Sequence, residues 1–399
     1  MSGTMISIRL LDNNLVELEF EDRFEYEMTR SELENRLGTG ATKSITHGEN
    51  NFSLNLRDFE YLLISENWLD DEYGITIEEE VMELLENSTE YHKELVEGGE
   101  EVWDAESILN HLTATYSTKR TPTDFQLENL EKMLMRPAAA SFSVPGAGKT
   151  SEGLCYWLCN RSEDGKLLVV LPKVGFLAWE EEFREWIGWG HDKVIRLDIS
   201  SADFDGKISA NPDASVYLVT YARARNNEKN ILDLMSEGEW SMILDESHNI
   251  KSLTGATSQS VRRIGNYARC CRLILTGTPA PQGEQDLHSQ AEFLQNRRIN
   301  SAECADWIRN IKVRTTKEQL KLKPTKTISH KEPLPKSHQA IYELLTNRLR
   351  RSIVDEENPD LAISEIRRHI MDIMRAASNP AILCKMPIFS NSLPKEMIA

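Results

Sequence analysis

The sequence predicts an α/β protein built on a parallel β-sheet that helices cover on both faces. From residue 138 onward, short apolar runs follow one another, each bounded by turn or helix signals. Helical stretches lie between most of these runs, and such an alternation is typical of a doubly wound parallel sheet. Polar motifs follow several runs directly, where the carboxyl ends of parallel strands gather ligands. The expected strands are AAASFSV (138–144), KLLVVLP (166–172), KVIRLD (193–198), SVYLVT (215–220), WSMILD (240–245) and CRLILT (271–276).

The segment before this sheet predicts a small acidic α+β domain. Residues 5–30 alternate apolar and charged side chains, which predicts a β-hairpin or small sheet turning at Asn13-Asn14. Residues 52–64 fit a strand or a helix, and residues 76–98 fit an acidic helix broken near Asn87-Ser88. Gly98-Gly99 and residues 115–123 have the composition of linkers.

The helices expected between the strands are 150–160, 176–187, 227–236 and 256–268. From about residue 286 onward the pattern is helical, with a basic extended stretch at 312–336 and one or two helices over 337–376. The expected domains are therefore an acidic N-terminal domain (1–114), an α/β lobe (115–296) and a helical, basic C-terminal extension (297–399).

The charge of the chain is distributed unevenly. The formal net charge is −18, but residues 1–110 carry 7 basic and 28 acidic side chains, so the remainder has a net charge of +3. The acid therefore belongs to the N-terminal domain, and the rest of the chain is free to meet nucleic acid. No apolar run reaches the ~18 residues of a membrane helix, and there is no secretory signal. Six cysteines without metal-site spacing favour reduced thiols and a cytoplasmic or nucleoid-associated location, with no membrane partner.

SVPGAGKT (143–150) predicts a phosphate-binding loop between a strand and a helix. Backbone N–H groups and the helix N-terminus would face the phosphates, which Gly146 and Gly148 allow to approach closely. Lys149 would reach the β- and γ-phosphates, and the Thr150 hydroxyl could bind Mg²⁺. Ser143 stands where the usual pattern has glycine, and a glycine-rich turn with an incidental lysine is the alternative. The expected nucleotide-binding residues of the loop are Pro145, Gly146, Ala147, Gly148, Lys149 and Thr150.

Asp245 and Glu246 end an apolar strand 96 residues after Lys149, in the sequence DESH. An aspartate beside a phosphate loop holds Mg²⁺, and a neighbouring glutamate can orient and deprotonate the attacking water. A solvated acidic strand end is the ordinary explanation of a lone Asp-Glu pair, but the phosphate loop makes it improbable here. LILTGTPAP (273–281) ends another strand, and its hydroxyls could sense the γ-phosphate through Glu246 and His248.

The order of these motifs resembles the Swi/Snf-type branch of the superfamily-two, helicase-like ATPases, which are related to the DEAD/DEAH-box proteins. The resemblance covers about residues 120–385 and implies a RecA-like P-loop NTPase lobe. Its motifs are matched by TPTDFQLENLEKML, LLVVLPKVGFLAWEEEFREW, VYLVTYARAR, DESHNIKS, LTGTPAPQGEQDLHSQAEFL, KVRTTKEQLKLKPTKT and IMRAASNPAIL, the last of which retains Asn379-Pro380. The departures are Ser143, Ser247, Gly283, Arg314-Thr315 and Ser378.

The resemblance implies a role for each matched residue. Gln126 would contact adenine; Lys149 and Thr150 would bind the phosphates and Mg²⁺. Asp245 would also bind Mg²⁺, and Glu246 would be the base. His248, Thr276, Gly277 and Thr278 would couple the nucleotide state to movement, with His248 also counted as catalytic. On the side of double-stranded DNA the resemblance places Lys173, Trp179, Thr220 and Lys251.

Such motors need a second RecA-like lobe that supplies arginines to the γ-phosphate, and residues 280–399 carry neither a strand-and-helix repeat nor the family's arginine motif. The chain is therefore expected to be the ATP-binding N-terminal half of an ATP-dependent DNA translocase, completed by another polypeptide or a missing segment. A nucleotide-gated scaffold that binds DNA or protein without turnover is the alternative, and an RNA-directed helicase is a third. The acidic domain could be a DNA mimic lying on residues 312–336, a docking site for a protein partner, or a solvated cap.

Overall fold

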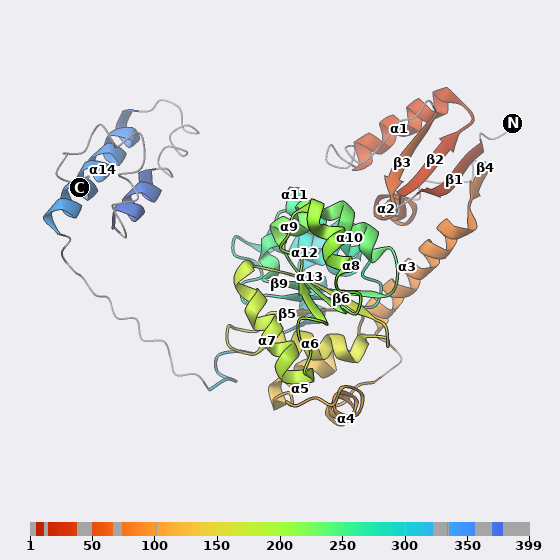
Figure 1. Ribbon diagram of the computed structural model, residues 1–399. Helices are drawn as coiled ribbons and strands as arrows, with labels where there is room; N and C mark the ends of the chain where they lie inside the picture. The colour runs from red at the N-terminus through yellow and green to blue at the C-terminus, as the bar shows by residue number, and fades with distance from the viewer. Residues whose placement is uncertain are drawn as a thin grey trace. The chain divides into compact units, whose positions relative to one another are not determined.

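The computed structural model describes residues 5–11, 15–37, 50–66, 74–99, 102–299, 301–321, 333, 335–355 and 369–377. The chain divides into two compact units, Met1–Leu322 and Lys323–Ala399. The first unit contains both sheets of the protein, and the second contains helix α14 (Figure 1).

The larger sheet has seven strands in the order β11-β5-β10-β9-β6-β8-β7, and every neighbouring pair is parallel. This arrangement confirms the predicted α/β doubly wound fold, and the six predicted strands are all present. Parallel neighbours need a crossover between them, and the helices between the apolar runs supply it. The strands are β5 (Ala138–Ser141), β6 (Lys166–Leu171), β7 (Val194–Arg196), β8 (Val216–Thr220), β9 (Trp240–Asp245), β10 (Arg272–Leu275) and β11 (Lys312–Val313).

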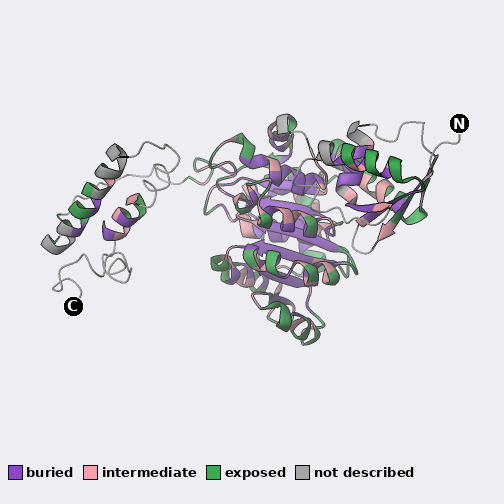
Figure 2. Ribbon diagram, turned by 90° about the horizontal axis from the view of Figure 1, so that it is seen from above, coloured by how far each residue is buried: buried purple, intermediate pink, exposed green. Residues whose placement is uncertain are grey.

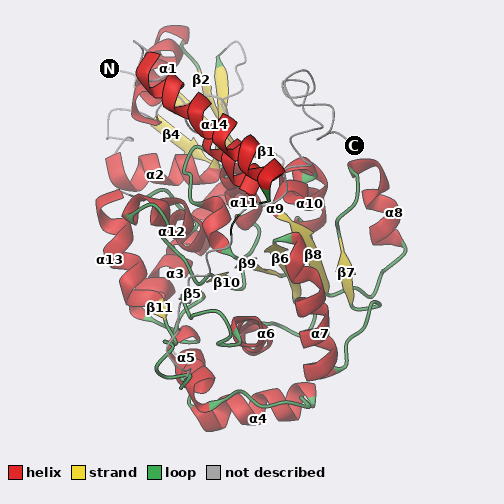
Figure 3. Cartoon of the chain, turned by 90° about the vertical axis from the view of Figure 1, so that its left-hand side faces the viewer, coloured by secondary structure: helices red, strands yellow, loops and turns green. Residues whose placement is uncertain are grey.

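The sheet is buried on both faces because successive side chains of each strand point to opposite sides. In β6, Leu167 and Val169 join one apolar core, whereas Leu168 and Val170 join the other. Helices α4–α7 contribute to the first core and α8–α13 to the second, as the two helical layers of Figure 3 show. Figure 2 shows the resulting buried layer of strands. The helices are α4 (Ala105–Tyr116), α5 (Asp124–Met133), α6 (Lys149–Asn160), α7 (Phe176–Ile187), α8 (Phe204–Ser209), α9 (Tyr221–Asn226), α10 (Glu228–Met235), α11 (Ala256–Gly265), α12 (His288–Gln295) and α13 (Ser301–Ile311), with short 3₁₀ turns η2 (Lys173–Gly175), η3 (Ser201–Asp203), η4 (Ser247–Ile250) and η5 (Glu284–Leu287).

The acidic N-terminal segment has a four-stranded sheet and an apolar core of its own. β1 pairs antiparallel with β2 and parallel with β4, and β2 pairs antiparallel with β3. Helix α3 follows this sheet, and the Tyr91 hydroxyl on α3 donates to the Leu294 carbonyl at 2.8 Å. The elements are β1 (Met5–Leu11), β2 (Leu15–Phe20), α1 (Arg23–Leu37), β3 (Asn51–Asn55), α2 (Leu56–Glu66), β4 (Gly74–Ile77) and α3 (Glu79–Glu97).

Two local predictions are wrong, and one strand was not predicted. The hairpin expected over residues 5–30 ends at Phe20, since α1 begins at Arg23 and the Asp22 carboxylate caps it by accepting from the Phe24 N–H at 2.8 Å. Helix α3 runs from Glu79 to Glu97 without a break. The basic stretch predicted as extended, 312–336, begins with β11, a seventh strand beside β5 that the sequence pattern did not indicate. The Asn13-Asn14 turn and residues 322–332 lie outside the described residues.

The second unit consists, in its described part, of α14 (Lys336–Asp355) and a helix over residues 369–377. Ile341, Leu345 and Ala376 are buried there. Asn379-Pro380 lies outside the described residues. No helix in the described part of the chain has the length and apolar character needed to cross a membrane.

Candidate functional site

The phosphate loop connects β5 to α6, whose first residue is Lys149. Gly146 and Gly148 have φ values of 86° and 76°, in the left-handed region that side chains with a Cβ disfavour. A Cβ on Gly146 would meet open space, whereas one on Gly148 would lie 2.5 Å from the Gln126 side chain. The loop therefore has an open side at Gly146 and a packed side at Gly148, and it leads into the N-terminus of α6, whose first N–H groups have no partner within the helix.

Two side chains hold the loop in this shape. The Lys149 ammonium donates to the Ser143 carbonyl at 3.0 Å and to the Val144 carbonyl at 3.5 Å. The Gln126 amide spans α5 and the loop: its oxygen accepts from the Thr123 N–H at 2.9 Å, and its nitrogen donates to the Gly148 carbonyl at 3.2 Å. Gln126 thus contacts the phosphate loop directly, and its predicted contact with adenine remains a proposal.

Ser143, the departure from the usual glycine, is fully buried and belongs to a polar network that we call the buried cluster. Its hydroxyl accepts from the Thr315 N–H at 3.0 Å and lies within hydrogen-bond distance, 3.2 Å, of the Ser141 hydroxyl. Ser141 also donates to Glu152 at 2.8 Å, and Asn129 donates to Glu152 at 2.7 Å and to the Thr315 hydroxyl at 2.9 Å. The buried cluster consists of Asn129, Ser141, Ser143, Glu152 and Thr315.

The buried cluster joins four segments around the base of the loop: α5, β5, α6 and the end of β11. Burial raises the pKa of Glu152, while the hydrogen bonds from Asn129 and Ser141 lower it in part. A serine at position 143 therefore has a structural function that glycine could not supply, because it links the loop to the chain that follows β11.

Asp245 lies at the carboxyl end of β9, and both its carboxylate oxygens accept hydrogen bonds. Oδ1 accepts from the Glu246 N–H at 3.0 Å, and Oδ2 accepts from the Trp179 indole at 3.0 Å. Burial raises the pKa of Asp245, and the hydrogen bond from Trp179 and the charge of Lys149 act in the opposite direction. The strand order agrees with this proximity, because β10 pairs with β5, which leads into the loop, and with β9, which ends at Asp245.

Glu246, His248, Thr276 and Thr278 form a second network, which we call the open cluster. Glu246 Oε2 accepts from the Thr276 hydroxyl at 3.2 Å and lies 3.2 Å from His248 Nδ1. His248 Nδ1 also lies 3.1 Å from the Thr276 hydroxyl and 3.4 Å from the Thr278 hydroxyl. The Glu246 side chain keeps 41% of its surface exposed, so it can reach a molecule in solvent while its neighbours hold it.

The backbone supports the open cluster at two points. Glu246 has φ 51° and ψ 53°, a left-handed conformation that costs a residue with a Cβ roughly 1 kcal/mol and turns the chain sharply at the strand end. Ser247, the departure from alanine, donates to the buried Gln290 amide at 2.7 Å, and Gln290 donates to the Pro279 carbonyl at 2.8 Å. Helix α12 thereby fixes the spacing between β9 and β10, which carry the two halves of the open cluster.

The predicted coupling residue Gly277 lies against the phosphate loop. A Cβ there would come within 3.2 Å of Pro145 Cδ, so a larger residue at this position would crowd the loop. The structure thus brings together the loop, the end of β9 and the turn after β10, as the sequence predicted for the carboxyl edge of the sheet.

Of the four residues expected on the DNA side, one does not fit. Lys173 is 81% exposed and lies 3.3 Å from Asp198; Lys251 is half-buried, and the half-buried Thr220 caps α9 by accepting from the Arg223 N–H. Trp179 is fully buried in the core beneath α7, and its indole is engaged with Asp245. The prediction for Trp179 is wrong because a side chain without exposed surface cannot contact DNA.

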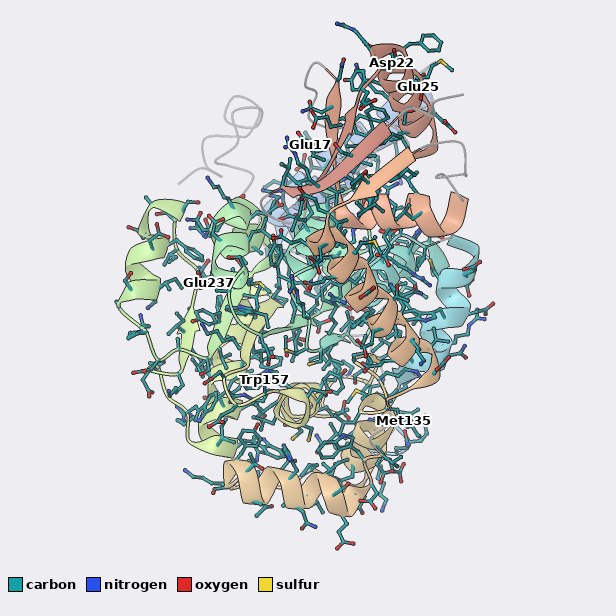
Figure 4. The ribbon with its side chains drawn as sticks, turned by 90° about the vertical axis from the view of Figure 1, so that its right-hand side faces the viewer. Glu17, Asp22, Glu25, Met135, Trp157 and Glu237 are labelled. Carbon is teal, nitrogen blue, oxygen red and sulfur yellow. The ribbon has the colours of Figure 1, made fainter. Side chains whose placement is uncertain are left out.

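Sequence reasoning missed the buried cluster and the Trp179–Asp245 contact. Asn129, Glu152 and Thr315 are far apart in the chain, and no spacing rule connects them. Trp157, labelled on α6 in Figure 4, is likewise fully buried, 5.9 Å from the Phe183 ring of α7. The signal that could have identified Trp179 is the high apolar content of its helix, which favours a core position for a tryptophan.

The residues present fit a magnesium nucleotide. The open space beside Gly146, the N-terminus of α6 and Lys149 suit a polyphosphate, while Thr150 and Asp245 offer two oxygen ligands. No group of three or more His, Cys, Asp or Glu side chains in the described residues could hold a metal ion by itself. Two protein ligands suit Mg²⁺, which keeps several waters and is completed by substrate phosphates.

A separate cavity of about 330 Å³ lies away from these strand ends, between α2, α3 and the loops that precede β5 and β10. Its lining mixes three glutamates with Arg269 and Arg272, and it contains none of the motif residues. The cavity is therefore not part of the candidate nucleotide site.

Comparison with known proteins agrees with the motif order. The mouse DNA annealing helicase and endonuclease ZRANB3 is 24% identical over 310 residues, covering 73% of this chain and 28% of that protein. The nuclear protein STH1/NPS1 of Saccharomyces cerevisiae is 28% identical over 232 residues, covering 54% of this chain and 16% of that protein. The chain spans less than a third of the length of either relative.

Among solved structures, the SWI2/SNF2 ATPase core of Sulfolobus solfataricus in complex with dsDNA is similar at 18% identity and a TM-score of 0.42, covering 71% of this chain and 62% of that chain. Residues 26–374 match the family described as the SNF2-related domain, which includes the phosphate loop, β9 with its Asp-Glu pair and the turn after β10. The protein therefore belongs to the SNF2-related domain family.

Proposed function

We propose that this chain is the ATP-binding half of an ATP-dependent, double-stranded DNA translocase that needs a second RecA-like lobe for efficient hydrolysis. The observation that carries the proposal is the convergence of Lys149, Asp245 and the open cluster at one edge of the sheet, in a chain of the SNF2-related family. If Asp245 and Glu246 formed only a solvated acidic strand end, nothing would require a glycine-rich loop to pack against the turn after β10.

The phosphate loop would bind ATP through backbone N–H groups and Lys149, with Gln126 near the adenine. Thr150 and Asp245 would hold Mg²⁺, which neutralises charge on the phosphates when it is bound. Because Lys149 already donates to two loop carbonyls, binding exchanges those bonds for stronger, charge-assisted bonds to phosphate oxygens.

Glu246 would orient the attacking water and accept its proton. Thr276 and His248 hold its Oε2, and they connect it to Thr278 in the turn packed against Pro145. A change at the γ-phosphate would therefore alter the hydrogen bonds of the turn after β10. This is the basis for the proposed coupling through Thr276, Gly277 and Thr278.

Double-stranded DNA would lie along the carboxyl edge of the sheet, near Lys173, Thr220 and Lys251. The exposed ammonium of Lys173 suits a phosphate contact, and its weak ion pair with Asp198 is open to exchange. The name of the mouse relative describes a helicase that anneals DNA, which supports DNA over RNA.

Hydrolysis would require arginines from outside this lobe, since positive charge at the γ-phosphate accelerates phosphoryl transfer by about 10³–10⁵-fold in related enzymes. The curated relatives are more than three times as long as the matched region, which leaves room in them for such a lobe.

The test is to measure ATP affinity by calorimetry, and turnover with and without duplex DNA, for the 399-residue chain. We expect Mg²⁺-dependent binding with slow turnover that DNA hardly stimulates. Lys149→Ala should weaken binding about 100-fold, since a hydrogen bond to a charged group contributes roughly 1.5–3 kcal/mol, whereas Glu246→Gln should retain ATP. Brisk DNA-stimulated turnover by the chain alone would contradict the half-motor, and absence of ATP binding would contradict the whole proposal.

A further inference from the structure

The indole of Trp179 contacts the carboxylate that the proposed function assigns to Mg²⁺. Its Nε1–H donates to Asp245 Oδ2 at 3.0 Å, from a side chain that has no exposed surface. The other carboxylate oxygen accepts from the Glu246 N–H, and the Tyr221 hydroxyl donates to the Asp245 carbonyl at 2.8 Å. Three hydrogen bonds thus hold Asp245. Of the three donors, the Trp179 indole is the one side chain that donates to the carboxylate.

Two glycines bring α6 and the start of α7 close enough for this contact. A Cβ on Gly153 of α6 would lie 3.2 Å from Trp179 Cη2 and 3.1 Å from Leu275 Cδ1. A Cβ on Gly175, just before α7, would lie 3.0 Å from Leu171 and 3.7 Å from Asp245 Oδ2. The indole is therefore packed between the sheet and the helix that begins with the phosphate loop, and its orientation is fixed by sterics.

We propose that Trp179 is a positioning residue that orients Asp245 for Mg²⁺. With Oδ2 engaged by the indole and Oδ1 by the Glu246 N–H, the plane of the carboxylate is fixed, and its remaining lone pairs point in defined directions. Partners that orient a ligand in this way typically contribute 10–100-fold to metal affinity. The inference rests on the proposed function, because it requires Asp245 to bind the metal of a magnesium nucleotide.

The same helix supplies a matched control. Trp186 lies on α7, is buried in the same core, and its indole N–H has no hydrogen-bond partner among the described residues. Trp186→Phe and Trp179→Phe therefore make the same change in ring size on one helix, but only the second removes a hydrogen bond to Asp245.

The experiment titrates Mg²⁺ at fixed ATP for the full chain and both variants, and repeats ATP binding in EDTA. For Trp179→Phe we expect the Mg²⁺ concentration at half-saturation to rise about 10-fold with unchanged affinity in EDTA. For Trp186→Phe we expect both quantities to stay as in the wild type. Trp179→His, which retains a ring N–H, should recover part of the Mg²⁺ affinity.

A spectroscopic measurement gives a readout besides binding. In ¹⁵N-labelled protein, the indole resonance that disappears in Trp179→Phe should move when Mg²⁺ is added to the ATP-bound wild type, while the Trp186 resonance should not. If Trp179→Phe fails to fold, benzothienylalanine at this position keeps the ring volume and removes the N–H, and the same titration applies.

Equal Mg²⁺ dependence of the two Phe variants, or a Trp179 resonance that ignores Mg²⁺, overturns the inference and leaves the proposed function intact. A wild-type chain that binds no magnesium nucleotide overturns the proposed function, and the inference with it.

Discussion

The buried cluster and the open cluster are two polar networks of similar size that touch the same phosphate loop, one through Ser143 and the other through the turn at Gly277. All members of the buried cluster are buried, and each bond in it joins protein to protein. The open cluster leaves the Glu246 side chain 41% exposed and the His248 side chain 34% exposed. The difference in burial separates a network that maintains the fold from one that can exchange partners with a ligand.

Burial also affects the ionisation of the buried cluster. Desolvation raises the pKa of Glu152 within the buried cluster, so the folded protein disfavours its charge. Substitutions in the buried cluster should therefore lower the free energy of unfolding more than equivalent substitutions in the open cluster, whose main effect should be on reactivity. Three experiments test this contrast.

The largest expected effect comes from Glu152→Ala. Removing the carboxylate leaves the Asn129 amide and the Ser141 hydroxyl without their acceptor, and each buried unsatisfied group costs roughly 1–3 kcal/mol. We expect the free energy of unfolding from urea titration to fall by about 3 kcal/mol. The comparison is Glu246→Gln, for which we expect a change within about 0.5 kcal/mol. Similar losses in both variants would remove the distinction between the clusters.

A smaller effect is expected from Thr315→Val, which keeps the side-chain shape but deletes the hydroxyl that accepts from Asn129. One N–H of the buried amide is then unpaired, so we expect a loss of about 1–2 kcal/mol in the free energy of unfolding. Thr278→Val in the open cluster is the matched substitution and should cost less than half as much, because water can replace its hydrogen bonds. The contrast fails if Thr278→Val is the more destabilising of the two.

The smallest effect is a pH dependence. An acid whose pKa is raised by folding stabilises the protein below its unfolded pKa, and this contribution is lost as the pH rises through the folded value. The free energy of unfolding of the wild type, relative to Glu152→Gln, should therefore decline as the pH increases from 4.5, the ordinary value for this side chain, through the raised pKa. The measurement is a urea titration of both proteins at several pH values. A difference that grows with pH would mean that the carboxylate is stabilised in the fold.

The sheet could be predicted from the sequence because six of its strands are mainly apolar runs, such as LLVVL (167–171) in β6, and burial on both faces favours this composition. Strand β11 could not be predicted, since Lys312–Val313 is too short to carry a pattern. Helix α3 continues past Asn87-Ser88 because its apolar stripe packs on both sides of that pair, and packing outweighs the weak helix propensity of asparagine and serine.

The residues of the candidate site could be predicted where they lie in motifs at strand ends. Lys149 begins the helix that follows β5, and Asp245 and Glu246 lie at the end of β9. The carboxyl ends of parallel strands lie at one edge of the sheet, so these residues are expected to lie near one another. Trp179 was placed wrongly because the motif resemblance was followed instead of the helical spacing, which puts Phe176, Trp179, Phe183 and Trp186 on one buried face of α7. Ser143 and Ser247 looked like simple departures, yet each hydroxyl makes a hydrogen bond that a residue without one could not.

The two edge strands of the seven-stranded sheet are short. They are β11 and β7, of 2 and 3 residues, with an exposed arginine in β7. Long bare edges recruit strands from other molecules and start aggregation, and short, charged ones do not. The short edge strands β7 and β11 therefore offer little backbone for strand pairing between molecules, so dilute and concentrated solutions of the chain should show the same apparent mass.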